Sequence, residues 1–173
     1  MALGFDTFLV MRHGIRESAS QLGCYFCSDV VAPTNSTREQ TLDQQCTVTR
    51  PGLAAMASAI AVELLVNCMH HPSAFAAEAE TLQDLSQSPN GPLGTVPHQL
   101  RGYLSHFAVI PLMSPAFDRC AACSERVLNA LDHDQMDFVL RALKNPEETL
   151  EQIAGLTQLK ERLENEDFLW ESD

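Results

Sequence analysis

Two Cys-x-x-Cys pairs, far apart in the sequence, constrain the fold of this chain more than any other feature. Cys24 and Cys27 form the first pair, Cys120 and Cys123 form the second, and 92 residues separate Cys27 from Cys120. Each pair can supply two thiolates from one tight turn, so two pairs complete the tetrahedron that a structural zinc ion prefers. The separation is far longer than in a local zinc ribbon. We therefore expect a zinc ion that joins two distant segments.

Disulfide formation is the alternative role for these cysteines, and the sequence context disfavours it. Residues 1–10 lack a basic region and are interrupted by Asp6, so they do not resemble a secretory signal. The longest apolar stretch, residues 53–66, contains Glu63 and is shorter than a membrane span requires. We therefore expect a soluble cytoplasmic protein, a setting in which paired cysteines bind metal more often than they form disulfides.

The charge of the chain restricts its partners. The formal net charge is −12, and residues 121–173 carry five Lys or Arg residues against thirteen Asp or Glu residues. Such a surface would be repelled by nucleic acid and by an anionic membrane, whereas it would attract a basic protein surface. A solvated acidic face that keeps the protein soluble is the alternative interpretation.

Hydropathy and turn residues divide the first part of the chain into four segments. Residues 5–11 have the β-branched and aromatic composition of a buried strand, and residues 15–50 are rich in the polar residues of loops. Residues 51–69 have almost no polar face, which predicts a helix buried on most sides. Residues 72–96 contain many Pro, Gly and Asn residues and predict a connection with little fixed structure.

The remaining segments predict one more strand and two helices. Residues 100–112 have the composition of a strand, and residues 125–143 have that of a helix. Asn145 and Pro146 form a helix start. Apolar residues then recur at helical spacing, at Leu150, Ile153, Leu156, Leu159 and Leu163. Strands and helices of this length in 173 residues predict an α/β fold with one adequate core.

Cys46 is a candidate nucleophile. It lies in a polar, loop-like stretch, a few residues before the helix start at Pro51 and close to Arg50. A helix N-terminus and a nearby cation both favour the thiolate, and they lower the pKa of a cysteine from about 8.5. The alternative is an unreactive surface cysteine. Cys68, inside the apolar helix, is predicted to be a core thiol.

Two segments of the chain invite comparison with phosphatase motifs. Arg12-His13-Gly14-Ile15-Arg16 resembles the signature of histidine phosphatases, and His133-Asp134 resembles their later motif, although Ser18 replaces the customary proline. A cysteine-phosphatase loop needs an arginine six places after Cys46, where Gly52 stands. The chain contains no Gly-x-Gly-x-x-Gly or Gly-Lys-Ser/Thr sequence, so no ATP site is predicted.

Taken together, several motifs closely resemble the autophagy ubiquitin-like-modifier-activating enzymes (autophagy-related protein seven). The motifs that carry the resemblance are Ala2 to Thr7, Met11 to Gly14, Leu22 to Cys27, Asp29 to Pro33, Ser36 to Arg38, Thr41 to Gly52, Val96 to Gly102 and Phe117 to Cys123. They cover nearly the whole chain, and they resemble only the C-terminal portion of such an enzyme.

The resemblance implies a fold and roles for individual residues. The chain would be the C-terminal part of a Rossmann-like ubiquitin-activating-type domain. Residues 1–143 would be the C-terminal part of the adenylation and catalytic-cysteine domain, and residues 144–173 a C-terminal helix and acidic tail. Cys46, in the motif Asp-Gln-x-Cys-Thr-Val, would accept the C-terminal glycine of a modifier as a thioester. The paired cysteines would bind structural zinc.

The resemblance also implies partners and a cofactor outside this chain. Partners would be autophagy ubiquitin-like modifiers and conjugating enzymes, and the full-length form would be a homodimer in the cytoplasm with recruitment to the phagophore assembly site. ATP is used by the family, but its Gly-rich site lies upstream of the matched motifs. The segment between Gly14 and Leu22 is also shorter than in relatives. Both features suggest a fragment or truncated form.

The acidic tail is the last candidate site. Phe168 and Trp170 stand among five acidic residues, and the tail region of this family is implied to capture the modifier. A merely solvated tail is the alternative. For the whole chain, the competing function is a non-catalytic, zinc-stapled module that binds a modifier or a conjugating enzyme without turnover.

Overall fold

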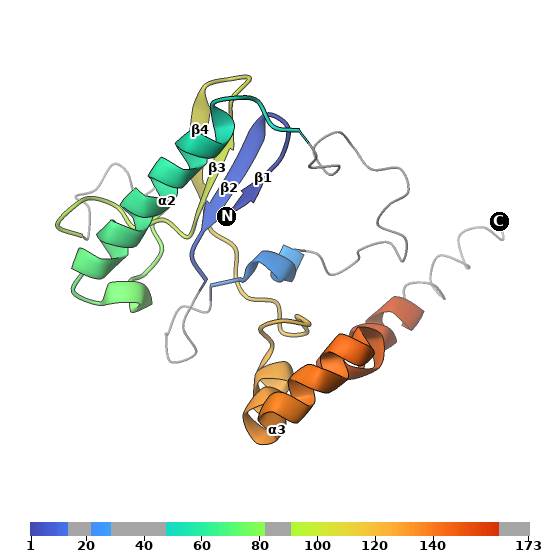
Figure 1. Ribbon diagram of the computed structural model, residues 1–173. Helices are drawn as coiled ribbons and strands as arrows, with labels where there is room; N and C mark the ends of the chain where they lie inside the picture. The colour runs from blue at the N-terminus through green and yellow to red at the C-terminus, as the bar shows by residue number, and fades with distance from the viewer. Residues whose placement is uncertain (14–21, 29–47, 82–90, 163–173) are drawn as a thin grey trace, which may run out of the picture. The chain divides into compact units, whose positions relative to one another are not determined.

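The computed structural model describes residues 1–13, 22–28, 48–81 and 91–162, which form two compact units (Figure 1). The described residues of the first unit fall within Met1–Leu22 and Pro33–Pro115, and those of the second within Gly23–Ala32 and Ala116–Asp173. The helix that ends near residue 143 packs onto the residues that follow it. The predicted boundary at residue 143 concerns the domains of the family, and it stays a prediction.

The first unit contains a four-stranded antiparallel sheet. Its strands follow the order β1 (Ala2–Leu3), β2 (Thr7–Met11), β3 (Gln99–Tyr103) and β4 (Ala108–Leu112). The predicted strand at residues 5–11 is confirmed as β2. The described strands and helices confirm a mixed α/β fold. Their pairs are antiparallel, so the Rossmann-like arrangement stays a prediction.

The prediction of one strand over residues 100–112 is wrong in extent. The segment forms a hairpin, β3 and β4, around a turn in which the N–H of His106 donates to the carbonyl of Tyr103. Phe107 adopts a φ of 48°, the left-handed backbone that a tight turn uses. The apolar composition that suggested one long strand therefore comes from two strands and an exposed phenylalanine at the turn between them.

Helix α2 (Leu53–His70) lies along one face of the sheet and confirms the predicted helix (Figure 1). Its buried residues recur at helical spacing and pack with Phe8 and Val10 of β2. They are Leu53, Ala57, Leu64 and Cys68. The expectation that this helix is buried on most sides is wrong, because only this one face packs on the sheet and Val62, Leu65 and Met69 are exposed.

The composition of α2 also resembles that of a membrane span. Over its 18 residues the mean hydropathy is 1.6, so by length and composition alone it could cross a membrane. A helix that packs on the core of a soluble domain has the same composition, and α2 packs on the sheet through its buried face. This feature is therefore weak support for a membrane segment.

One glycine fixes the packing of the sheet. Gly102 lies opposite Phe8 in the β2–β3 register. A Cβ atom at Gly102 would lie 2.0 Å from Cε1 of the Phe8 ring, which is far inside van der Waals contact. The ring therefore lies over the backbone of Gly102, and this position requires glycine.

The second unit is helical and begins with the short 3-10 helix η1 (Tyr25–Ser28). Helix α3 (Glu125–Lys144) confirms the predicted helix, and it has a kink at Gln135, whose φ and ψ are 45° and −115°. The π-helical turn η4 (Glu147–Glu151) and α4 (Gln152–Ala154) follow. The predicted helix start is confirmed, since the side chain of Asn145 accepts a hydrogen bond from the N–H of Glu148.

The helix predicted after Asn145 is interrupted at Gly155. This glycine has a φ of 83°, ends α4, and is followed by a further helical segment at residues 156–162. The break lets residues on both sides of it reach one apolar cluster. The buried members of this cluster are Val127, Phe138, Ala154 and Leu156, and Leu150, Ile153 and Leu159 pack against them.

Candidate functional site

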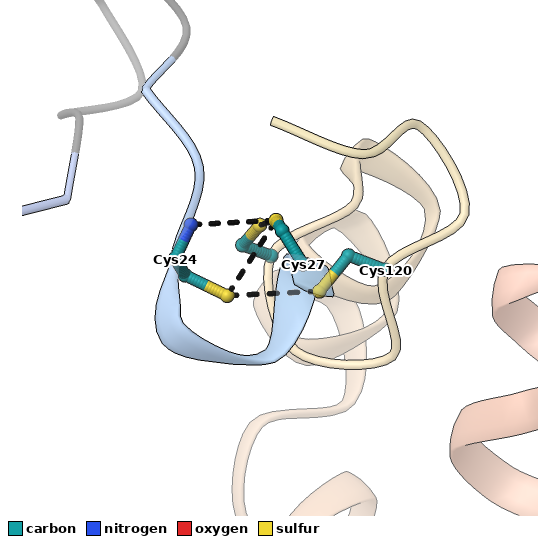
Figure 2. A group of neighbouring side chains, drawn as sticks. Cys24, Cys27 and Cys120 are labelled. Carbon is teal, nitrogen blue, oxygen red and sulfur yellow. Dashed lines mark hydrogen bonds between the residues drawn. The ribbon is translucent and has the colours of Figure 1, made fainter. Parts of the chain in front are cut away.

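The structure brings the four paired cysteines together in the second unit. Figure 2 shows Cys24, Cys27 and Cys120, in which the Sγ atom of Cys24 lies 3.6 Å from that of Cys120 and 3.8 Å from that of Cys27. The Sγ atoms of Cys27 and Cys123 lie 3.4 Å apart. All four sulfur atoms lie within 4.8 Å of one another. The cluster thus joins two segments that are distant in sequence, as the spacing of the pairs predicts.

These distances fit a tetrahedral thiolate site. A zinc ion with four Zn–S bonds of about 2.3 Å would place its ligands about 3.8 Å apart. In the first pair, Cys24 directly precedes η1 and Cys27 lies within it, and the second pair lies in the turns that lead into α3. Cys27 and Cys120 are buried, whereas Cys24 and Cys123 are partly buried. The donor set therefore suits a closed metal site with four protein ligands.

The electrostatics of the cluster also favour a cation. Burial raises the pKa of Cys24 to about 11, and burial together with the neighbouring thiols raises the pKa of Cys123. Burial opposes ionisation of Cys27 too, but hydrogen bonds from the N–H of Phe117 and from Cys123 lower its pKa. Four thiolates this close would repel one another unless a positive ion lay among them. A divalent metal supplies that charge.

Backbone N–H groups surround the sulfur atoms. The N–H of Phe117 donates to Cys27 Sγ over 3.3 Å, that of Cys24 donates to the same sulfur over 3.3 Å, and that of Ala122 donates to Cys120 Sγ over 3.4 Å. Donors of this kind stabilise thiolate and orient metal ligands. Sequence analysis missed them, because main-chain donors leave no signal in residue identity.

The other predicted site residues lie outside the described residues. They are Cys46, Phe168 and Trp170. Arg50, predicted to favour a thiolate at Cys46, is described, and its backbone N–H donates to the carbonyl of Phe5. Cys68 is 1% exposed and packs in the core of the first unit, which confirms its prediction as a core thiol.

Arg12, part of the phosphatase-like motif, is a buried residue of the first unit. Its guanidinium donates to the carbonyls of Phe75, Ala77, Val96 and Pro97. Burial lowers the pKa of Arg12. A guanidinium that is engaged with four carbonyls is not placed to bind a phosphoryl group, so the geometry does not support the histidine-phosphatase alternative.

The contacts of Arg12 also correct the expectation that residues 72–96 have little fixed structure. In the described part of this connection, the side chain of Glu80 accepts a 2.9 Å hydrogen bond from the N–H of Val96. The side-chain amide of Asn67 donates to the carbonyl of Thr95 over 2.7 Å. Composition alone did not reveal this order, because two of the partners, the buried Arg12 and the partly buried Asn67, lie elsewhere in the sequence.

The sequence of this chain is similar to those of several curated proteins. No profile of a known protein family matches the chain. The chain is 48% identical over 177 residues to the ubiquitin-like modifier-activating enzyme ATG7 of Saccharomyces cerevisiae, across 99% of this chain and 26% of the yeast protein. It is 43% identical over 188 residues to the enzyme of that name from Dictyostelium discoideum, again across 99% of the chain and 26% of the relative.

The human protein shows the same partial relationship. The ubiquitin-like modifier-activating enzyme ATG7 of Homo sapiens is 43% identical over 187 residues, which cover 91% of this chain and 27% of the human protein. The chain thus spans about a quarter of the length of the curated relatives it matches. The resemblance to the autophagy ubiquitin-like-modifier-activating enzymes that the motifs predict is therefore confirmed, and it extends over nearly all of this chain.

Proposed function

We propose that this chain acts in the activation of ubiquitin-like modifiers in autophagy and carries the modifier as a thioester on Cys46. The observation that supports the proposal most strongly is the 43–48% identity, over 91–99% of the chain, to proteins named as ubiquitin-like modifier-activating enzymes. Cys46 has polar neighbours in the sequence, as expected of an acceptor thiol, and the described Cys68 is a buried core residue that a modifier could not reach.

The proposed chemistry consists of two successive acyl transfers, first from AMP to Cys46 and then from Cys46 to a conjugating enzyme. The thiolate of Cys46 attacks the carbonyl carbon of the modifier's C-terminal glycine while that carbon is joined to AMP. A C–S bond forms, the C–O bond to the phosphate breaks, and AMP leaves with its electron pair. The thiolate of a conjugating enzyme then attacks the same carbon and regenerates Cys46. No redox partner is required.

The nucleotide chemistry is assigned to the part of the enzyme that this chain does not match. The chain spans about a quarter of its relatives and has no Gly-rich nucleotide motif, so we assign ATP binding to the remaining three quarters. The antiparallel sheet and α2 are proposed to be one edge of the larger Rossmann-like domain that the resemblance implies.

A structural zinc ion is proposed for the four-cysteine cluster. Cys24, Cys27, Cys120 and Cys123 would be its ligands, and the distances among their sulfur atoms support this assignment. With four thiolate ligands no position remains for water, so the ion would hold segments together rather than take part in the acyl transfer.

The proposal extends to partners and location. The full-length form is proposed to be a cytoplasmic homodimer that is recruited to the phagophore assembly site and works with autophagy modifiers and conjugating enzymes. Phe168 and Trp170 are proposed as contacts for the modifier, because an aromatic anchor beside acidic residues suits a basic groove.

A chimera tests the acceptor cysteine. This chain would replace the matching quarter of the yeast relative, and the chimera would be incubated with ATP and a ubiquitin-like modifier. We expect an adduct that thiol reagents release, and we expect Cys46→Ser to abolish it or convert it to a thiol-resistant ester. Gel electrophoresis with and without reducing agent measures both.

Cys68→Ala is the matched control, since it removes a buried thiol of the first unit and should leave the adduct unchanged. An undiminished thiol-sensitive adduct on Cys46→Ser would contradict the assignment. Modifier binding without any adduct, in a chimera that still forms the acyl-adenylate, would favour the non-catalytic binding module instead.

A further inference from the structure

The second half of α3, after the kink at Gln135, presents a row of large apolar side chains to solvent. Their exposed fractions are 67%, 37%, 49% and 77% for Met136, Val139, Leu140 and Leu143. The last three follow Met136 by three, four and seven residues, so all four share one face of the helix. We call this face the α3 stripe.

The opposite face of the same helical segment is already used by the fold. Phe138 is 5% exposed and packs in the apolar cluster of the second unit, and Ala142, one turn further on, is partly buried. The α3 stripe is therefore separate from the surface that holds the helix in place. Contiguous exposed side chains of this size mark an interaction surface, whereas scattered single ones do not.

The spacing of the stripe suggests the shape of its occupant. From Met136 to Leu143 the helix rises by about 10 Å, or two turns. Side chains at intervals of three, four and seven residues form the ridges that interlock with those of another helix. Two turns of a partner helix with the same apolar spacing would therefore cover the stripe.

The charges around the stripe suggest the sign of that occupant. Residues 132–148 contain five carboxylates and two cations, a formal charge of −3. The carboxylates are Asp132, Asp134, Asp137, Glu147 and Glu148, and the cations are Arg141 and Lys144. Arg141 forms an ion pair with Asp134. This pair leaves Lys144 as the single remaining cation of residues 132–148, against four carboxylates.

Three of these carboxylates are exposed and available to a partner. Asp137 flanks the stripe on α3, and Glu147 and Glu148 lie in η4, just beyond the C-terminal end of α3. Within the described part of the chain, their side chains form no hydrogen bond or ion pair. An acidic occupant would be repelled by them, whereas a basic one would be opposed only by Lys144. The charges therefore favour a basic occupant.

We propose that the α3 stripe binds a basic amphipathic helix of a partner protein. The apolar side chains of the partner would lie across the stripe, and its Lys or Arg residues would lie toward Asp137, Glu147 and Glu148. This inference goes beyond the proposed thioester chemistry and does not depend on it, because none of these residues belongs to the acceptor or the metal site.

Two peptides of opposite charge test the proposal. Each has about 15 residues, a length at which an isolated helix is marginal in water, and carries Leu at the same helical spacing as the stripe. One has Lys at its remaining positions, and the other has Glu. In calorimetry with the full chain we expect the Lys peptide to bind, more weakly as salt rises, and the Glu peptide not to bind.

Variants of the stripe separate the apolar contact from the charge. Met136→Gln combined with Leu143→Gln keeps the charge and should weaken the binding of the Lys peptide about tenfold or more. Asp137→Asn should weaken it less and reduce its salt dependence, whereas Lys144→Gln should strengthen it. Leu140→Gln provides a milder single variant, and circular dichroism confirms that each variant is folded.

Val62→Gln combined with Leu65→Gln is the matched control, because both side chains are exposed on α2 in the first unit. It should leave the affinity for the Lys peptide unchanged. Failure of the Lys peptide to bind, equal binding of the Glu peptide, or equal losses in the two double variants would overturn the proposal. Self-association of the chain without peptide, abolished by the stripe double variant, would also overturn it, since the occupant would then be a second copy.

Discussion

Each of the two units of this protein is stabilised internally in a different way. In the first, a sheet and α2 bury an apolar core, and Arg12 joins the connecting segments through backbone carbonyls. In the second, a smaller apolar cluster lies between α3 and the residues that follow it, and four cysteines join η1 to the segment before α3. Stability should therefore depend on packing in the first unit and on metal in the second.

Loss of the proposed zinc ion should have the largest effect, and the effect should be confined to the second unit. Structural zinc contributes on the order of 10 kcal/mol of apparent binding free energy, and this energy stabilises the fold. Chelation under reducing conditions, or Cys123→Ser, should therefore remove hydrogen-exchange protection from α3 and leave β2 and β3 protected. Elemental analysis should find one zinc ion per chain before treatment.

The matched control for Cys123→Ser is Cys68→Ala, which removes a thiol from the first unit and should leave the zinc content unchanged. If the reduced, metal-free protein kept its protection in α3 and its melting temperature, the structural role of the cluster would be wrong.

A methyl group on Gly102 should produce the next largest effect, in the first unit only. The Cβ of Gly102→Ala would lie 2.0 Å from Phe8 Cε1, so the ring must move within a packed core. Overpacking of this kind costs about 1–3 kcal/mol or more. Thermal unfolding should show the loss, and hydrogen exchange should locate it in β2 and β3.

Two further variants test that explanation. Gly52→Ala adds a methyl group where no atom lies within 4 Å, so it should change stability little. Combining Gly102→Ala with Phe8→Leu should cost less than the two separate losses together, because the smaller side chain leaves space for the new Cβ. Additive losses would show that the Phe8 ring is not the cause.

The smallest effect is expected at Gly155, in the second unit. Its φ of 83° lies in the left-handed region, where a residue with a Cβ atom costs about 1–2 kcal/mol. Gly155→Ala should lower the free energy of unfolding by roughly that amount. Chemical denaturation of the zinc-bound protein measures the change.

Asparagine adopts the left-handed conformation more readily than alanine, so Gly155→Asn is the control and should be less destabilising. Equal losses for the two variants would point to the 3.1 Å contact between a new Cβ and Nη1 of Arg126, and not to the backbone conformation.

Sequence analysis succeeded where the signal was local or chemically distinctive. The spacing of the Cys pairs predicted a cluster that joins distant segments, and Asn145 predicted the start of the helical segment after α3. Composition predicted α2 and α3 to within a few residues. These features depend on residue type at short range, or on a ligand preference that only cysteine meets.

The errors concern features that depend on partners elsewhere in the fold. An apolar helix such as α2 gives no indication of how much of its surface another element will cover, and only one face packs on the sheet. The sequence of the β3–β4 hairpin predicts one strand because Phe107 is apolar like the residues around it. In the structure Phe107 is exposed at the turn between two strands. The motif that contains Arg12 resembles a histidine-phosphatase signature, but the guanidinium of Arg12 donates to backbone carbonyls of distant segments.

Arg12 has a further consequence for how the chain tolerates changes in length. Its acceptors lie on both sides of residues 82–90, and the Glu80–Val96 and Asn67–Thr95 hydrogen bonds fix the same two flanks. When both ends of a connection are anchored, each doubling of its length costs only about 0.6 kcal/mol in closure entropy. Extra residues inserted between 82 and 90 would thus leave the neighbouring core intact.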